Sequence, residues 1–82
     1  MEETWFVYLL KCSDSTIYCG ISNNVEKRVI AHNKSKGAKY TKTRTPVELI
    51  WKSTSMSKSN ALKLEYKIKQ MPREEKLKLC QT

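Results

Sequence analysis

Two tyrosines, an arginine, a histidine and a glutamate are spaced so that a small fold could gather them into one site. Tyr8 and Tyr18 fall on the two strands of a predicted β-hairpin, which holds cross-strand residues side by side. Arg28 and His32 are four residues apart on a predicted helix and therefore project from one face. Glu65 lies at the edge of the apolar stripe of a later helix.

These residue types are the parts that a metal-dependent phosphodiesterase needs. A carboxylate binds a hard cation together with phosphate oxygens of the substrate, a guanidinium stabilises charge on the phosphoryl group, and a phenol or imidazole deprotonates water. Each residue also has an ordinary explanation. A strand tyrosine packs in a core, Arg28 and His32 cover a helix surface, and Glu65 pairs with Lys69 at i+4. Spacing alone therefore does not name a reaction.

The elements that must position these residues follow from the apolar pattern. Runs of β-branched and aromatic residues predict strands over residues 4–11, 17–21 and 47–52. Capping residues and helical spacing predict helices from Asn23 or Asn24 to about Asn33, from Ser57 or Ser59 to about Met71, and from Pro72 to about Cys80. The order β-β-α-β-α-α predicts an α+β fold with helices flanking a three-stranded, mainly antiparallel sheet.

Three local patterns within these elements carry expectations of their own. Gly20 inside a strand predicts a bulge or a group that approaches the backbone closely. In the third strand, alternation predicts one drier face and one wetter face. The drier face is predicted to hold Val47, Leu49 and Trp51, and the wetter face Glu48, Ile50 and Lys52. The spacing of the second helix predicts a buried stripe of Ala61, Leu64, Ile68 and Met71.

The length and charge of the chain limit the classes of protein to consider. Eighty-two residues predict one domain, 1–82, and exclude a Rossmann domain or a TIM barrel. Residues 1–26 carry 1 − 4 = −3 and residues 27–82 carry 15 − 4 = +11, within a net charge of +8. Such a basic region indicates a polyanionic partner, nucleic acid above all, although a merely solvated basic surface explains it as well.

Cysteine usage and hydropathy add a location and argue against zinc. The sequence has no apolar run long enough for a membrane span and no signal segment, which predicts a cytoplasmic protein. The odd number of cysteines and the lack of a signal segment predict reduced thiols, and no CxxC pair supports a zinc site. Cys12, Cys19 and His32 together fall short of the four ligands of an ordinary zinc site.

The ordered set of motifs resembles the GIY-YIG nuclease domain, and especially small stand-alone members of that family to which no function is assigned. The resemblance covers about residues 4–79. It is carried by Phe6-Val7-Tyr8, Tyr18-Cys19-Gly20-Ile21, Arg28, His32-Asn33, Gly37-Ala38-Lys39-Tyr40-Thr41, Arg44-Thr45-Pro46-Val47, Ala61, Glu65 and Ile68-Lys69.

The resemblance implies a metal-dependent endonuclease that hydrolyses DNA phosphodiester bonds, with branched or damaged DNA in repair or recombination as candidate substrates. It implies that Tyr8 positions or deprotonates the attacking water, that Tyr18 hydrogen-bonds the water or the scissile phosphate, and that His32 accepts a proton. By the same resemblance Arg28 stabilises the phosphate and Glu65 is the single protein ligand of Mg²⁺ or Mn²⁺. The expected nucleic-acid-binding residues are Lys27, Lys39, Tyr40, Lys42 and Arg44.

Several departures from the family pattern keep other functions open. Phe6 and Cys19 replace a Gly and an Ile of the name motif, at positions expected to pack the strands. Many family nucleases carry an Asn beyond the glutamate, and only Gln70 or Gln81 could stand in for it. The alternatives are a nucleic-acid-binding module that cuts poorly and a protein-interaction module with a solvated basic face. A protein partner that supplies specificity is a further expectation.

Overall fold

The computed structural model describes residues 4–34 and 44–80, and its core is a three-stranded antiparallel sheet. The strands are β1 (Phe6–Lys11), β2 (Ile17–Ser22) and β3 (Glu48–Lys52), in the spatial order β2-β1-β3. The helices are α1 (Val25–Asn33), α3 (Lys58–Lys69) and α4 (Arg73–Leu79). The predicted α+β fold and element order are confirmed.

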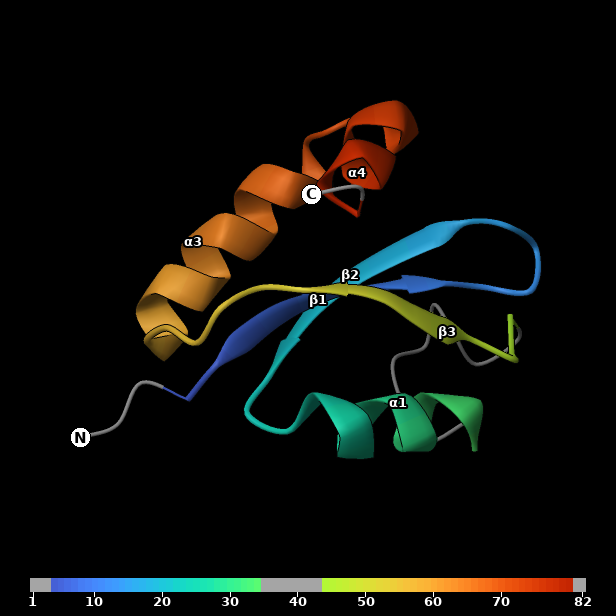
Figure 1. Ribbon diagram of the computed structural model, residues 1–82, viewed down its shortest axis with the longest axis horizontal. Coiled ribbons are helices and arrows are strands. Elements are labelled where there is room, and N and C mark those ends of the chain that lie inside the picture. Colours follow the sequence, from blue (N-terminus) through green and yellow to red (C-terminus); the bar gives the residue numbers. More distant parts are fainter. Residues whose placement is uncertain (1–3, 35–43, 81–82) are drawn as a thin grey trace.

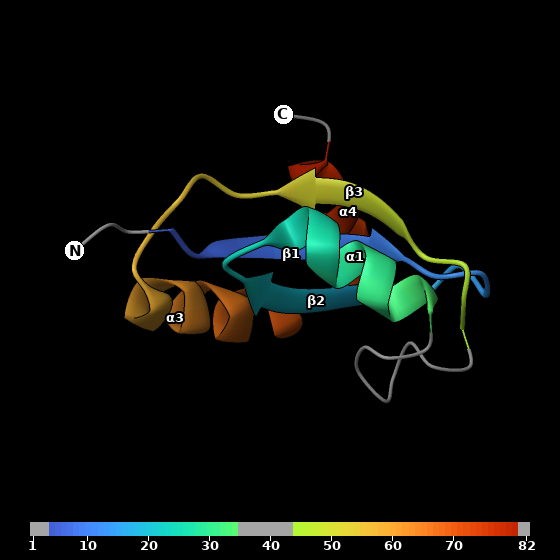
Figure 2. The same cartoon turned by 90° about the horizontal axis from the view of Figure 1, so that it is seen from below.

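The central strand β1 is covered on both faces, which explains its unbroken apolar sequence. Val7 and Leu9 face α3, where they form a core with Ala61 and Ile68. Tyr8 and Leu10 face α1. They pack with Val25, which is buried, and with Val29, which is half-buried. Figure 1 shows α3 and α4 on one side of the sheet and α1 on the other, and Figure 2 looks onto the α1 side.

Local side-chain hydrogen bonds fix the ends of the elements close to the predicted residues. The Asn24 side chain accepts a hydrogen bond from the Lys27 N–H and caps α1, and Ser57 caps α3 in the same way. In the hairpin turn, Asp14 Oδ1 accepts hydrogen bonds from both the N–H and the hydroxyl of Thr16. Pro72 is the residue before α4 and not its first residue.

The predicted alternation of β3 is wrong from Leu49 onward: Leu49 itself is exposed, and beyond it a bulge interrupts the pairing with β1. Leu10 pairs with Leu49, but Leu9 pairs with Trp51, so Ile50 has no partner in the register. Ile50 and Trp51 consequently both pack against the core on the α3 side, and Leu49 is left exposed. The stripe predicted for α3 is confirmed at Ala61 and Ile68, which are fully buried, whereas Leu64 and Met71 are only partly buried against the same core.

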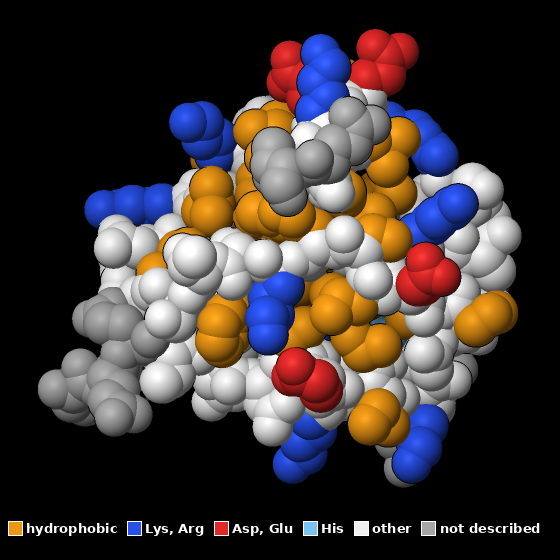
Figure 3. Space-filling view, in the orientation of Figure 1, with side chains coloured by type: hydrophobic (Ala, Val, Ile, Leu, Met, Phe, Trp, Pro, Cys, Tyr) orange, Lys and Arg blue, Asp and Glu red, His pale blue; other side chains and the backbone are white. Residues whose placement is uncertain are grey.

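The surface on the α3 side of the sheet carries an apolar groove. Trp51, Met56, Leu64 and Met71 line this hollow of about 470 Å³ between β3 and α3. Figure 3 shows hydrophobic side chains gathered there, with Lys and Arg side chains around them. None of the helices in the described part of the chain is long and apolar enough to cross a membrane.

Candidate active site

A buried tyrosine–histidine pair forms the centre of the candidate site, on the α1 side of the sheet. Tyr8 lies in the middle strand and is 1% exposed, and His32 lies in the last turn of α1 and is 0% exposed. The Tyr8 hydroxyl and His32 Nε2 are 3.1 Å apart. In the tautomer that carries its proton on Nδ1, His32 accepts a hydrogen bond from Tyr8 through Nε2. The helix therefore holds an acceptor directly against a strand phenol.

Gly20 makes room for this pair. It is the cross-strand partner of Tyr8, so their side chains share one face of the sheet. A Cβ atom on Gly20 would lie 2.7 Å from the Tyr8 hydroxyl oxygen and 2.8 Å from Tyr8 Cζ. It would also lie 3.1 Å from Cε2 of Tyr18. The close approach expected at Gly20 is thus made by the two tyrosine rings, and any larger residue would displace them.

Tyr18 extends the pair to the edge of the sheet. Its ring centroid is 5.3 Å from that of His32 and 6.4 Å from that of Tyr8. Unlike Tyr8, Tyr18 is only half-buried, because β2 is an edge strand. The partly exposed Arg28 projects from α1 on this side of the sheet. The site therefore opens to solvent along β2, with Tyr18 and Arg28 outermost and the Tyr8–His32 pair beneath.

Burial and the Arg28 charge set the protonation states of the site. Burial raises the pKa of Tyr8 to about 12, although a hydrogen bond from Arg28 opposes the rise. Burial also raises the pKa of Tyr18, against the opposing charges of Lys69 and Arg28. The pKa of His32 is lowered, first by burial and then by Arg28. At neutral pH both phenols keep their protons and the imidazole is uncharged, so its Nε2 can accept the hydrogen bond from Tyr8.

Glu65 reaches the same sheet edge from the opposite face. It lies on α3, its side chain is 18% exposed, and its Oε2 is 3.3 Å from Lys69 Nζ. Its charge is felt at Tyr18, whose pKa it raises, and at Cys19 beneath it, whose pKa burial and Glu65 raise to about 11. Helices from both faces of the sheet therefore contribute charged groups to the β2 edge.

The donor set at this edge fits a hard divalent cation and does not fit zinc. Among residues 4–34 and 44–80, no three His, Cys, Asp or Glu side chains come together as a metal cluster. A single carboxylate, Glu65, suits Mg²⁺ or Mn²⁺, which keep several waters and take further oxygens from a phosphate. The described cysteines are free thiols, and Cys12 and Cys19 belong to the cores on opposite faces of the sheet.

Comparison with known proteins places this arrangement in a family. Residues 4–78, nearly the whole chain, match the GIY-YIG catalytic domain. The chain belongs to the GIY-YIG family. This membership indicates nuclease activity, and with it nucleic-acid binding and a general dependence on a divalent metal.

Proteins of the UPF0213 group are similar to this chain over most of their length. A UPF0213 protein of Staphylococcus epidermidis is 54% identical over 76 residues, which are 93% of each chain. One from Oceanobacillus iheyensis is 47% identical over 81 residues, covering 99% of this chain and 94% of the other. The solution structure of a UPF0213 protein from Bacillus halodurans superposes with a TM-score of 0.57 at 37% identity, covering 92% of this chain and 80% of that one.

The basic residues expected to bind nucleic acid are only partly gathered at this GIY-YIG site. Lys27 is exposed on α1, next to Arg28. Arg44 lies instead at the hairpin turn, where its Nε is 2.9 Å from Asp14 Oδ2. There Asp14 has a lowered pKa, owing to hydrogen bonds from Thr16 and then to Arg44. Lys39, Tyr40 and Lys42 lie outside the described residues.

The residues that replace a Gly and an Ile of the GIY-YIG pattern pack the sheet. The remaining departure is the Asn that many family nucleases carry beyond the glutamate. Phe6 packs in the α1-side core with Lys52 Nζ 4.9 Å from its ring centroid, and Cys19 is buried in the α3-side core. Gln70 is the exposed residue that ends α3. Gln81 lies outside the described residues.

Sequence reasoning missed the structural role of Asn33, which holds α1 in place. Its Oδ1 accepts a hydrogen bond from the Val47 N–H at 2.6 Å, and its Nδ2 donates to the Val47 carbonyl at 3.1 Å. These two bonds tie the end of α1, and with it the adjacent His32, to the start of β3. The partners are fourteen residues apart, so no helical or strand periodicity could have revealed them.

Proposed function

We propose that the protein is a metal-dependent endonuclease that hydrolyses DNA phosphodiester bonds at the β2 edge. The observation that carries the proposal is the hydrogen bond between the buried Tyr8 hydroxyl and a neutral His32, at 3.1 Å. A buried phenol held against an uncharged imidazole is a ready route for a proton out of a reaction site.

The different exposures of the two tyrosines divide the work between them. Tyr18, half-buried at the edge strand, faces the substrate side and orients the attacking water against the phosphate. Tyr8, with a pKa of about 12, is no preformed base; it passes its own proton to His32 as it takes one from the water. The water oxygen then bonds to phosphorus and the bond from phosphorus to the leaving sugar oxygen breaks, and that oxygen takes a proton from solvent.

Arg28 and Glu65 supply the electrostatic part of the reaction. The Arg28 guanidinium donates hydrogen bonds to phosphate oxygens on which negative charge develops. Glu65 would hold Mg²⁺ or Mn²⁺, with waters and phosphate oxygens completing the coordination. When bound, the cation acts as a Lewis acid and a template for the phosphate.

The decisive experiment compares cleavage by matched variants in Mn²⁺ and in Mg²⁺. Supercoiled plasmid, linear duplex, branched DNA and DNA with an abasic site are the substrates. Arg28→Ala and Glu65→Gln should abolish cleavage, whereas Arg73→Ala and Glu75→Gln, both on the exposed surface of α4, should retain it. Equal activity in all four variants would mean a contaminating nuclease and would refute the proposal. Preferential cutting of the branched or damaged substrates would point to repair or recombination.

A second candidate function is nucleic-acid binding with little cleavage. The observation that favours it is the ion pair between Glu65 and Lys69, which places an ammonium group where the carboxylate would bind a cation. A module that contacts ~4 phosphates should lose affinity with a log–log salt slope near −3.6. Tight, salt-dependent binding that Glu65→Gln leaves unchanged, with no cleavage in either metal, would favour this function over the endonuclease.

A further inference from the structure

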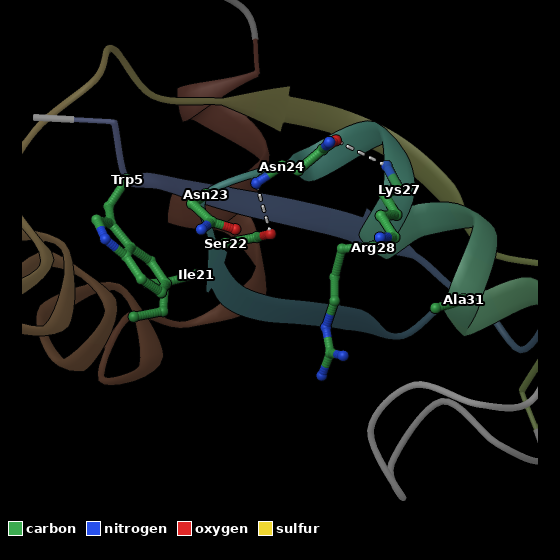
Figure 4. Close-up of a pocket in the computed structure, with 8 residues that line it drawn as sticks. All are labelled: Trp5, Ile21, Ser22, Asn23, Asn24, Lys27, Arg28 and Ala31. Carbon is green, nitrogen blue, oxygen red and sulfur yellow. Dashed lines mark hydrogen bonds between the residues drawn. The ribbon is translucent and has the colours of Figure 1, made fainter. Parts of the chain in front are cut away.

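A hollow of about 370 Å³ lies beside Arg28, between the end of β2 and the first turns of α1. Figure 4 shows its two ends. Trp5 and Ile21 lie at one end, Lys27 and Arg28 at the other, and Asn23 lies between them where β2 leads into α1. Its volume falls within the ~300–1,000 Å³ of sites that bind small organic groups. Arg28 is thus shared between this hollow and the candidate active site.

The lining of the hollow changes character from one end to the other. Trp5 and Ile21 form an apolar end suited to the face of a flat ring. Asn23 offers an amide that forms no side-chain hydrogen bond with any residue in the described ranges. Lys27 and Arg28 make the other end cationic, and Lys58 Nζ lies over the Trp5 ring, 5.1 Å from its centroid. Among the residues that the structure describes, none of those lining the hollow is acidic.

From this lining we infer that the hollow binds the base of an unpaired nucleotide next to the scissile phosphate, with Trp5 as its stacking surface. The inference rests on the proposed function, because Arg28 fixes where the neighbouring phosphate lies. It adds a substrate class: DNA that presents a nucleotide outside the stack, at a single-stranded branch or beside a lesion. A fully paired base would first have to leave its duplex, which costs a few kcal/mol of unstacking and unpairing.

Backbone hydrogen bonds and packing against the core hold Trp5 at its end of the hollow. Its backbone N–H donates to the Met56 carbonyl at 3.0 Å, and the Met56 N–H donates back at 2.8 Å. The ring is half-buried against the α3-side core and carries the Lys58 cation over it. A side chain ordered before binding loses little entropy when a base stacks on it. A phosphate alone would need only Lys27 and Arg28 and would leave the apolar end of the hollow unfilled.

Tryptophan fluorescence can read this site directly, because the chain has only two tryptophans. Trp51→Phe leaves Trp5 as the single emitter without changing the hollow. We expect a decathymidylate strand to quench its emission, and a strand of the same length made of abasic sugars to leave it nearly unchanged. Trp5→Phe, which leaves Trp51 in the other groove, is the control and should show no base-dependent quenching. Quenching of Trp5 by both strands alike, or by neither, would overturn the inference.

Affinity gives a second, independent readout with a matched pair of substitutions. Trp5→Leu should weaken binding of the decathymidylate by ~5- to 150-fold, the range for loss of one stacked base. It should leave binding of a blunt duplex within about twofold. Trp51→Leu removes the other half-buried tryptophan, which lines the groove between β3 and α3 and not this hollow, and should leave both affinities unchanged. Equal weakening by the two variants would overturn the inference, and the Trp51→Phe titration remains readable if either leucine variant fails to fold.

These measurements separate failure of the inference from failure of the proposed endonuclease. They are made without metal, so they do not depend on cleavage. Base-dependent quenching in a protein that cuts none of the four DNA substrates would refute the proposed endonuclease and support the nucleotide-binding site. Cleavage without base-dependent quenching would refute the nucleotide-binding site and support the endonuclease.

Discussion

Replacing Gly20 with alanine tests whether the cross-strand space it leaves is what holds the Tyr8–His32 pair together. The added Cβ would lie 2.7 Å from the Tyr8 hydroxyl oxygen and 2.8 Å from its Cζ, against about 3.4 Å for ordinary contact. The tyrosine must therefore move by 3.4 − 2.7 = 0.7 Å. Along the bond to His32, that displacement changes 3.1 Å to 3.8 Å or to 2.4 Å. Neither length is that of a normal hydrogen bond.

The expected loss of stability is modest and the expected loss of activity is large. Overpacking a well-filled site costs about 1–3 kcal/mol, and Tyr8, 1% exposed, has little room to yield. Gly→Ala also stabilises by about 0.4–1 kcal/mol through the unfolded chain, since Gly20 does not have a positive φ. We therefore expect a net loss of about 1–2 kcal/mol. Cleavage should fall toward the level of Tyr8→Phe, about 10²-fold or more below wild type, because the same proton route is broken.

A double-mutant cycle separates this explanation from general damage. Urea unfolding gives the stability of Gly20→Ala, Tyr8→Phe and the double variant, and plasmid cleavage gives their rates. If Gly20→Ala acts through the Tyr8 hydroxyl, the double variant should cut no more slowly than Tyr8→Phe alone. Rates that multiply, or a Gly20→Ala protein as stable and active as wild type, would refute the reasoning.

Three further perturbations test other contacts of the site. His32 is the single histidine and burial lowers its pKa, so the unfolded chain protonates first and stability in urea should fall below pH 6.5, by at most ~1.4 kcal/mol per pH unit. His32→Asn should flatten the profile between pH 6.5 and 5, and an unchanged slope would contradict the assignment. Asn33→Ala should lower the free energy of unfolding by ~1–3 kcal/mol, because it unpairs two backbone groups of Val47; a loss under 0.5 kcal/mol would refute this role. Lys69→Met should tighten Mn²⁺ binding in calorimetry by ~1.4- to 5-fold, because it frees Glu65 from its ion pair, and weaker binding would show that Lys69 assists the metal site.

Local signals in the sequence were sufficient to predict the elements. Asn24 and Ser57 cap the helices because each side chain reaches an N–H three residues on, a contact that needs nothing from the rest of the fold. The stripe of α3, with Ala61 and Ile68 at its centre, follows from helical periodicity alone. The hairpin follows from two β-rich runs joined by a turn. Each prediction depended on residues close in the chain.

Contacts between distant segments could not be predicted in the same way. The bulge at Ile50 exists because β3 must fit the register of β1, about forty residues earlier, and it reverses the alternation that the isolated strand suggests. Arg44, expected to bind nucleic acid, pairs with Asp14 thirty residues away. The sequence left open whether His32 is exposed or buried, because its position on the helix is compatible with both. Only the packing of α1 on β1 decides between them.

The same reasoning explains why the two tyrosines, alike in sequence, differ in chemistry. A hairpin places Tyr8 and Tyr18 on neighbouring strands, and spacing alone treats them as equivalent. The sheet order makes them unequal: β1 lies between two strands and under α1, so burial moves the pKa of Tyr8 to about 12, whereas β2 is an edge. A phenol with that pKa can relay a proton only if it gives up its own proton as it takes another from the water. His32, on α1, is the acceptor of that proton. The order of the strands, more than the presence of two tyrosines, is therefore what turns this sheet edge into a candidate site for proton transfer.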